Sequence, residues 1–222
     1  MFAITPLQIT HTYRNANSFV VPIPNSPKKI LVDAGGPDLE LYKEIIKKSE
    51  LAAIFLTHEH ADHCLCVDDL KAYYDCQIYA SKQAAENVKD PKHNFSQYID
   101  EIPAFSVQSK ISALDNRQSI TIGGVTIVAF ETPGHSPGSM CYNIDGLWFT
   151  GDTILNKTKT PLSFPHSSRK AYQASLLSLL PQMKKGQVIY PGHNLPFELT
   201  DLHLLLTSIH QSKLISNLPG ID

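Results

Sequence analysis

Hydrophobic and polar positions along the first half of the chain change period several times, which predicts short strands alternating with helices. Strands are expected where β-rich or fully apolar runs lie between turn residues, at 3–10, 19–23, 29–32, 51–57 and 77–80. Helices are expected where the apolar spacing forms one face, at 38–49, 62–74 and 81–88. The first three strands predict an antiparallel meander.

The second half repeats this logic after a long loop at 90–110 that leaves room for one helical turn. Strand patterns flank the hairpin dipeptides Gly123-Gly124 and Asp145-Gly146. The pattern predicts strands at 119–122, 125–131, 139–144, 147–150 and 187–190, a loop at 154–168, and helices at 169–183 and 200–216. Strands followed by helices in each half predict two antiparallel-rich sheets packed together with helices outside.

Composition agrees with a globular protein built around a substantial core. The chain has 222 residues, of which 42% are hydrophobic and 18% are charged. We therefore expect a single domain over 1–222. The four cysteines are few and unevenly spaced, which predicts free, mostly buried thiols rather than a disulfide scaffold.

Charge and hydropathy exclude several classes of partner. The formal net charge of −2 lacks the basic excess of a nucleic-acid-binding surface, so no nucleic acid partner is expected. The longest apolar run, 51–56, is far shorter than the roughly 20 residues of a membrane-spanning helix. The opening MFAITPLQIT lacks the features of a signal peptide. We expect a cytoplasmic protein that acts on a small molecule without a membrane, and the sequence predicts no oligomeric state.

The strongest chemical pattern follows the buried strand at 51–57. His58-x-His60-x-Asp62-His63 places four candidate metal ligands within six residues. Chance would produce this pattern in about one chain in a thousand of this composition. At an extended strand end His58 and His60 point the same way and can share one ion, while Asp62 and His63 can face a second. The alternative is a solvated polar turn, which this density of ligands disfavours.

Three later segments each place a ligand-capable side chain directly after a predicted strand. They are Thr132-Pro133-Gly134-His135, Gly151-Asp152-Thr153 and Tyr190-Pro191-Gly192-His193. Taken singly, each is an ordinary turn or helix cap. Together with the first cluster they supply five histidines and two aspartates, which is what a two-metal site with a shared carboxylate requires.

These segments, in this order, resemble those of the metallo-β-lactamase superfamily. The resemblance covers about residues 18–195 and includes Asp33-Ala34-Gly35 and the run from Thr132 to Ser139. It implies an α+β fold, a four-layer αββα sandwich of two mixed, largely antiparallel sheets. It also implies that one metal is held by His58, His60 and His135, that the second is held by Asp62, His63 and His193, and that Asp152 bridges them.

The resemblance implies a hydrolase with two divalent ions, zinc or alternatively iron or manganese. An aspartate at the bridging position favours relatives similar to short glyoxalase II and lactonase enzymes over antibiotic resistance. The expected substrate is a small ester, thioester or lactone, with a hydroxyacyl-glutathione thioester as the best guess. A metal-bridged hydroxide attacks, and Asp62 can accept a proton. The alternatives are a persulfide dioxygenase with one iron, or a phosphodiesterase of the same superfamily.

Two further sets of residues are weaker candidates. Lys157, Lys159 and Arg169 lie in or after the 154–168 loop, where they can receive a substrate carboxylate or form a solvated basic surface. Asp33, at the end of a predicted strand, can orient one of the metal-binding histidines or act as a turn residue before Gly35-Gly36.

Overall fold

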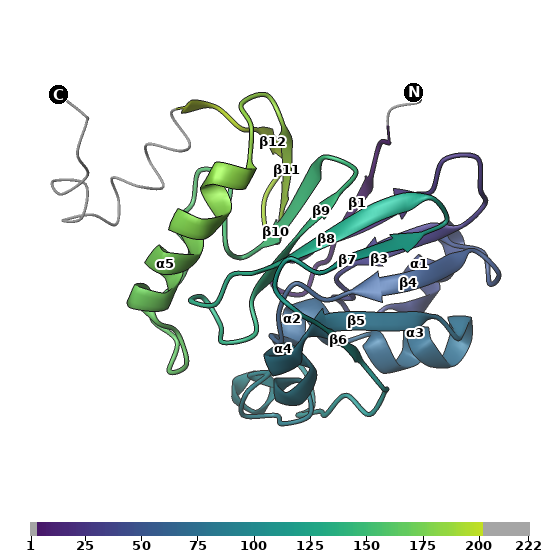
Figure 1. Cartoon of the computed structure of the whole chain (residues 1–222). Helices are drawn as coiled ribbons and strands as arrows, with labels where there is room; N and C mark the ends of the chain where they lie inside the picture. Colours follow the sequence, from purple (N-terminus) through teal and green to yellow (C-terminus); the bar gives the residue numbers. More distant parts are fainter. Residues whose placement is uncertain (1–3, 202–222) are drawn as a thin grey trace, which may run out of the picture.

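The computed structural model describes residues 4–201 as two six-stranded sheets that pack face to face with helices on both outer sides (Figure 1). The first sheet contains, in spatial order, β1 (Leu7–Thr10), β2 (Asn17–Pro22), β3 (Lys29–Val32), β4 (Leu51–Phe55), β5 (Gln77–Ser81) and β6 (Ser112–Leu114). The second contains β12 (Phe197–Glu198), β11 (Val188–Pro191), β10 (Leu147–Gly151), β9 (Met140–Ile144), β8 (Val125–Glu131) and β7 (Ser119–Ile122).

Both sheets mix parallel and antiparallel neighbours. In the first, β1, β2 and β3 form the predicted antiparallel meander, and β3, β4, β5 and β6 then run parallel. In the second, β7 to β10 are antiparallel, β10 and β11 are parallel, and β12 is antiparallel to β11. The two mixed sheets and the four layers confirm the predicted fold class.

Alternating side chains explain why the first sheet is covered on both faces. Val20, Leu31 and Ile54 pack against residues of α1 (Leu39–Ile45) and α3 (Val67–Tyr74). Their neighbours in sequence, Val21 and Phe55, point the other way and pack against the second sheet. Because side chains alternate along a strand, consecutive apolar residues fill two cores at once.

The second sheet is covered on its outer face by α5 (Arg169–Leu179). Trp148 and Ile189 of the sheet pack against Tyr172, Leu176 and Leu179 of this helix. In Figure 1 α5 lies on one side of the pair of sheets and α1 and α3 lie on the other. Three buried layers of side chains therefore hold the four layers together.

The helix expected at 62–74 is two helices, α2 (Ala61–Cys64) and α3. The interruption has a visible cause, because the backbone of Ala34 accepts from Cys66 N and donates to His63 O. These two bonds take the carbonyl of His63 away from the helical ladder. The loop after β3 therefore ends α2 just beyond the candidate ligand His63, and α3 begins in a new direction.

Other differences concern short elements and element ends. The strands β6 and β12 were not predicted, and the helical turn in the 90–110 loop is the 3-10 turn Ser96–Tyr98. The helix at 81–88 is α4 (Lys82–Asn87), and the helix at 169–183 ends as the 3-10 turn Leu180–Gln182. The helix expected at 200–216 lies outside the described residues, apart from its first two positions. Within 4–201 no helix combines the length and apolar character needed to cross a bilayer.

Candidate metal centre

The seven predicted ligands come from four segments, each of which follows a strand. His58, His60, Asp62 and His63 follow β4 of the first sheet. The second sheet contributes the other three, with His135 after β8, Asp152 after β10 and His193 after β11. The structure brings all seven together at one end of the sandwich, where three overlapping groups of their ligand atoms form. Both sheets therefore supply part of one site.

The first trio consists of His58, His60 and His135. Their ligand nitrogens lie within 4.8 Å of one another, and all three side chains are buried. His135 Nε2 lies 3.0 Å from His60 Nδ1. Such convergence of three imidazoles suits a divalent transition metal.

The second trio consists of Asp62, His63 and His193, whose ligand atoms also lie within 4.8 Å of one another. Asp62 Oδ2 is 3.8 Å from His63 Nε2 and 3.6 Å from His193 Nε2. This trio is more open than the first, since the side chains of Asp62 and His193 are 18% and 22% exposed. A molecule entering from solvent would therefore meet the second trio directly.

The buried carboxylate of Asp152 lies between the two trios. Its Oδ2 is 3.5 Å from His135 Nε2 of the first trio and 3.4 Å from His193 Nε2 of the second. Its Oδ1 is 3.6 Å from His63 Nε2. One carboxylate thus faces histidine nitrogens of both groups.

Contacts on the outer side of the rings orient four of the five histidines. His135 Nδ1 is 2.9 Å from Pro161 O, and His193 Nδ1 is 3.1 Å from Asn15 O. A carbonyl only accepts, so each Nδ1 carries a proton and each Nε2 faces the centre. His63 Nδ1 donates in the same way to Asp33 Oδ2 at 2.9 Å, and His58 Nδ1 lies 3.1 Å from Thr57 Oγ1.

Three buried atoms at the centre have no hydrogen-bond partner among the described residues, and they provide a test of whether a metal fits. They are His58 Nε2, His63 Nε2 and Asp152 Oδ1. Leaving a buried polar atom unpaired costs about 1–3 kcal/mol. Unprotonated imidazole nitrogens and a carboxylate oxygen are ligands that zinc, iron and manganese accept. The residues present therefore fit a cation.

Electrostatics divides the centre into a neutral part and a charged part. Burial and the neighbouring His63 and His60 rings hold the pKa of His58 well below its usual range, and burial does the same for the pKa of His60. Burial alone would lower the pKa of His63, but the carboxylates of Asp62, Asp33 and Asp152 raise it to about 10. The negative charge is concentrated on the side of the second trio.

Asp152 keeps its charge although it is buried. Burial by itself would raise its pKa, but the hydrogen bond with His193 and the nearby His135 and His63 rings hold the pKa well below its usual range. The backbone leaves room for this carboxylate only because residue 192 is a glycine. A Cβ on Gly192 would overlap Asp152 Oδ1 and would lie 2.9 Å from His63 Cε1.

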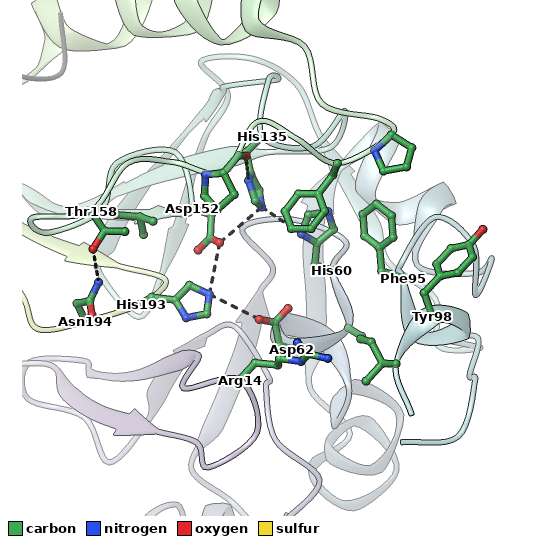
Figure 2. Close-up of a pocket in the computed structure, with 16 residues that line it drawn as sticks. Arg14, His60, Asp62, Phe95, Tyr98, His135, Asp152, Thr158, His193 and Asn194 are labelled. Atoms are coloured by element: carbon green, nitrogen blue, oxygen red, sulfur yellow. Dashed lines mark hydrogen bonds and ion pairs between the residues drawn. The ribbon is translucent and has the colours of Figure 1, made fainter. Parts of the chain in front are cut away.

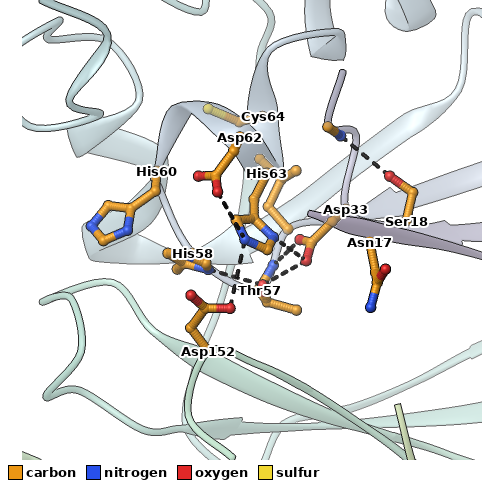
Figure 3. A network of polar contacts seen from close by, with 12 residues as sticks. Asn17, Ser18, Asp33, Thr57, His58, His60, Asp62, His63, Cys64 and Asp152 are labelled. Carbon is orange, nitrogen blue, oxygen red and sulfur yellow. Dashed lines mark hydrogen bonds and ion pairs between the residues drawn. The ribbon is translucent and has the colours of Figure 1, made fainter. Parts of the chain in front are cut away.

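Asp33 joins the first sheet to the centre through one buried carboxylate (Figure 3). Its Oδ1 accepts from Thr57 N at 2.7 Å, and its Oδ2 accepts from Thr57 Oγ1 at 2.7 Å and from His63 Nδ1 at 2.9 Å. Asp33 has a positive φ of 59°, which is costly for a residue with a side chain. The contact with His63 is the one expected of an orienting residue.

Glu59 is a functional candidate that the sequence analysis did not single out. It lies between His58 and His60 but points away from the centre, and it is 1% exposed. Its carboxylate accepts from Ser136 Oγ at 2.7 Å, from Gly138 N at 3.2 Å and from Asn87 Nδ2 at 2.7 Å. The signal for it is a charged residue at the alternate position of a buried strand end.

A cavity of about 710 Å³ opens beside both trios and Asp152 (Figure 2). It is large enough for a small substrate. His60, Asp62, His135, Asp152 and His193 all contribute to its wall. The predicted substrate contacts Lys157, Lys159 and Arg169 do not line it, and the cation that does is Arg14, from the turn between β1 and β2.

Known proteins share the segments that carry the predicted ligands. The family model of the metallo-beta-lactamase superfamily matches residues 11–193, which contain all seven predicted ligands. A probable polyketide biosynthesis zinc-dependent hydrolase, PksB of Bacillus subtilis (strain 168), is 31% identical over 147 residues, 66% of this chain and 58% of the relative. A hydroxyacylglutathione hydrolase of Bdellovibrio bacteriovorus is 34% identical over 141 residues, 62% of this chain and 48% of the relative. The chain thus matches about half the length of these two relatives.

Among solved structures, the BLEG-1 B3 metallo-beta-lactamase is similar with a TM-score of 0.78 at 24% sequence identity. The similarity covers 87% of this chain and 94% of that chain. At this level of identity the comparison concerns the fold, which is the same sandwich of two mixed sheets.

Proposed function

The chain belongs to the metallo-beta-lactamase superfamily, and on that premise we propose that it is a hydrolase that uses two divalent metal ions to cleave a small ester, thioester or lactone. The observation that carries the proposal is Asp152, whose buried carboxylate lies 3.5 Å from a nitrogen of the first trio and 3.4 Å from one of the second. A single domain carries both halves of the site.

In this proposal each trio holds one ion. His58, His60 and His135 bind the first, Asp62, His63 and His193 bind the second, and Asp152 is shared. Zinc is the favoured metal because the Bacillus subtilis relative is named as zinc-dependent. Imidazole and carboxylate ligands also accept iron and manganese, so availability can decide the metal found in the cell.

When bound at this centre, divalent ions supply Lewis acidity and a water of lowered pKa. The chain contributes the carboxylate of Asp62, which lines the cavity and can accept a proton from the attacking water. The oxygen of this water joins the acyl carbon and the C–S or C–O bond breaks. The thiolate or alkoxide that is released takes up the proton that Asp62 accepted. Asp33 is a positioning residue that holds the ring of His63.

A hydroxyacyl-glutathione thioester is the first substrate to test, because the Bdellovibrio bacteriovorus relative is named as a hydroxyacylglutathione hydrolase. The partner is thus a small molecule rather than a nucleic acid, in keeping with the net charge of −2.

The test is metal analysis of the purified protein combined with a hydrolysis screen over lactoylglutathione, acyl lactones, nitrocefin and bis-p-nitrophenyl phosphate. We expect close to two ions per chain and turnover of an ester, thioester or lactone that needs no oxygen. His58→Ala and Asp152→Ala should each abolish turnover and reduce bound metal, whereas His93→Ala, at a half-exposed histidine outside the cavity lining, should change neither.

Two results would overturn the proposal. One is a His58→Ala or Asp152→Ala protein that keeps full activity and its full complement of ions. The other is a single bound iron with oxygen uptake on glutathione persulfide, which would assign the chain to the dioxygenase alternative.

A further inference from the structure

An aromatic wall, which consists of Phe95, Tyr98 and Phe164, lines the cavity next to the first trio. Figure 2 labels Phe95 and Tyr98. The ring centroids of Phe95 and His60 are 4.8 Å apart, and those of Phe164 and His60 are 5.3 Å apart. Phe95 and Phe164 are themselves 5.3 Å apart, and Tyr98 continues the surface outward at 6.1 Å from Phe95. The wall thus starts at a candidate ligand and ends at the mouth of the cavity.

The backbone around Phe95 is built to hold this ring in the cavity. Phe95 has a positive φ of 65°, a conformation that costs free energy for a residue with a side chain. Buried hydrogen bonds of its neighbours offset this cost, since Asn94 Nδ2 donates to Val88 O at 3.1 Å and Ser96 N donates to Asn94 Oδ1 at 2.8 Å. Asn94 O also accepts from Ala61 N at 2.8 Å, which ties the loop to the metal-binding segment.

The outer part of the wall is exposed to solvent. Tyr98 is 62% exposed and Phe164 is 38% exposed, and both border the same cavity. Contiguous apolar surface that is exposed at the edge of a site is typical of ligand-binding grooves. Pro161 and Pro165 extend this side of the cavity with further apolar surface.

The polar lining offers little to a strongly charged substrate. Arg14 lines the cavity, but its guanidinium already lies 3.2 Å from Glu101 Oε2, and both side chains are about half-exposed or more. Thr158 and Asn194 add neutral groups. The charged tripeptide of a glutathione thioester could therefore contact one cation in the described lining, and that cation is already paired. An apolar group could contact a continuous apolar surface.

We propose that the aromatic wall is a subsite for an apolar group attached next to the scissile bond, so that the preferred substrates are esters or thioesters that carry such a group. This inference rests on the proposed function, because it assumes that the scissile carbonyl lies at the two trios. The apolar group can belong to the acyl half or to the leaving group. In either case thioesters with an apolar group are better substrates than lactoylglutathione.

The experiment uses two series of thioesters with the metal-loaded protein. One series lengthens the acyl chain from acetyl to octanoyl on N-acetylcysteamine, and the other keeps the acetyl group and lengthens an alkanethiol. We expect kcat/KM to rise about two- to fourfold per methylene in one series, because burial of each methylene is favourable. The series that shows the rise identifies the half that lies on the wall.

Variants locate the effect. Phe164→Ala and Tyr98→Ala should each flatten the dependence of kcat/KM on chain length. Leu177→Ala is the matched control, since Leu177 is 61% exposed on α5 and does not line the cavity. Binding of ethyl and octyl thioether analogues, measured by calorimetry, gives the same comparison without turnover.

Two outcomes are distinct. If both thioester series are flat and the octyl analogue binds no more tightly than the ethyl analogue, the aromatic wall is not a substrate subsite, and the proposed hydrolase function stands on the acetyl thioester. If no ester, thioester or lactone is cleaved by the metal-loaded protein, the proposed function fails. The binding comparison then still decides whether the wall holds an apolar group.

Discussion

The carboxylate of Asp33 binds two residues at once, Thr57 and His63. It receives the N–H and the hydroxyl of Thr57 and holds the outer nitrogen of His63. An outer carboxylate fixes the orientation of a metal-binding ring and makes the ring a better ligand. The unusual backbone of Asp33, with its positive φ, is maintained by these bonds.

We expect Asp33→Ala to weaken metal binding about 10- to 100-fold, the usual effect of removing such an outer partner. The metal affinity is measured by competition with a coloured chelator. Asp33→Asn keeps the size of the side chain and should recover part of the affinity. Asp115→Asn, at an exposed turn, is the control. Equal affinity in the wild type and Asp33→Ala would show that the contact with His63 is only structural.

The pKa of His63, raised to about 10 in the metal-free protein, predicts that metal binding releases protons. At neutral pH the ring is protonated, and a metal can bind only the unprotonated nitrogen. Metal affinity should therefore increase as the pH rises toward about 10. Calorimetric titrations in buffers of different ionisation enthalpy count the protons.

The stability of the metal-free protein should change with pH in the direction opposite to that of the metal affinity. A histidine whose pKa is raised by folding stabilises the metal-free protein fully below its unfolded pKa of about 6.5, and this contribution is lost as the pH rises through about 10. Metal binding without proton release would contradict the charged state of His63 proposed here.

Glu59 connects three separate elements behind the centre. It follows β4, and its carboxylate accepts from Asn87 at the end of α4 and from Ser136 and Gly138 in the segment between β8 and β9. That segment carries His135. The position of His135 relative to His58 and His60 therefore depends on a buried carboxylate that does not face the candidate metal centre.

We expect Glu59→Ala to lower the free energy of unfolding by about 3 kcal/mol or more, because several buried donors lose their acceptor at once. Urea unfolding of the metal-loaded protein measures the loss. Ser136→Ala removes one of these bonds and should cost less. Glu44→Ala is an exposed glutamate on α1 and should be close to neutral. A Glu59→Ala protein as stable as Glu44→Ala would show that the elements hold together without this carboxylate.

The elements show which features a sequence can predict. The ends of β3, β7 and β8 were predicted correctly, because each is bounded by turn residues and has a clear pattern. The strands β6 and β12 have three and two residues, too few for a period to be visible. The break between α2 and α3 depends on Ala34, which is far away in the sequence.

The same distinction applies to the site. The seven candidate ligands could be found because histidine and aspartate are rare at such close spacing after strands. Arg14 and Phe95 owe their places to tertiary contacts that leave no short pattern, whereas the signal for Glu59 is a charged residue at a buried strand end. The basic residues Lys157 and Lys159 are conspicuous in the sequence, but the turn that carries Arg14 is the one that reaches the cavity.

At the scale of the whole molecule, each sheet carries about half of the candidate metal centre. The first sheet contributes His58, His60, Asp62 and His63, and the second contributes His135, Asp152 and His193. Each trio takes candidate ligands from both sheets, so an ion bound to either trio would link the two halves of the sandwich. Without a cation the buried nitrogens of His58 and His63 and an oxygen of Asp152 stay unpaired. Metal occupancy should therefore determine a large share of the stability of the protein.

We expect removal of metal with a chelator, followed by gel filtration to remove the chelator, to lower the Tm by about 5–10 °C. A ligand present at 100 times its Kd contributes about 2.7 kcal/mol, and each kcal/mol shifts the Tm of a chain of this size by about 2–4 °C. Zinc added back should restore the Tm. The Asp152→Ala protein is the matched control, since it lacks the shared carboxylate and should respond much less to either treatment. If the wild type contains two ions and melts at the same temperature without them, the two sheets hold together independently of the centre, and the link between metal binding and the sandwich is wrong.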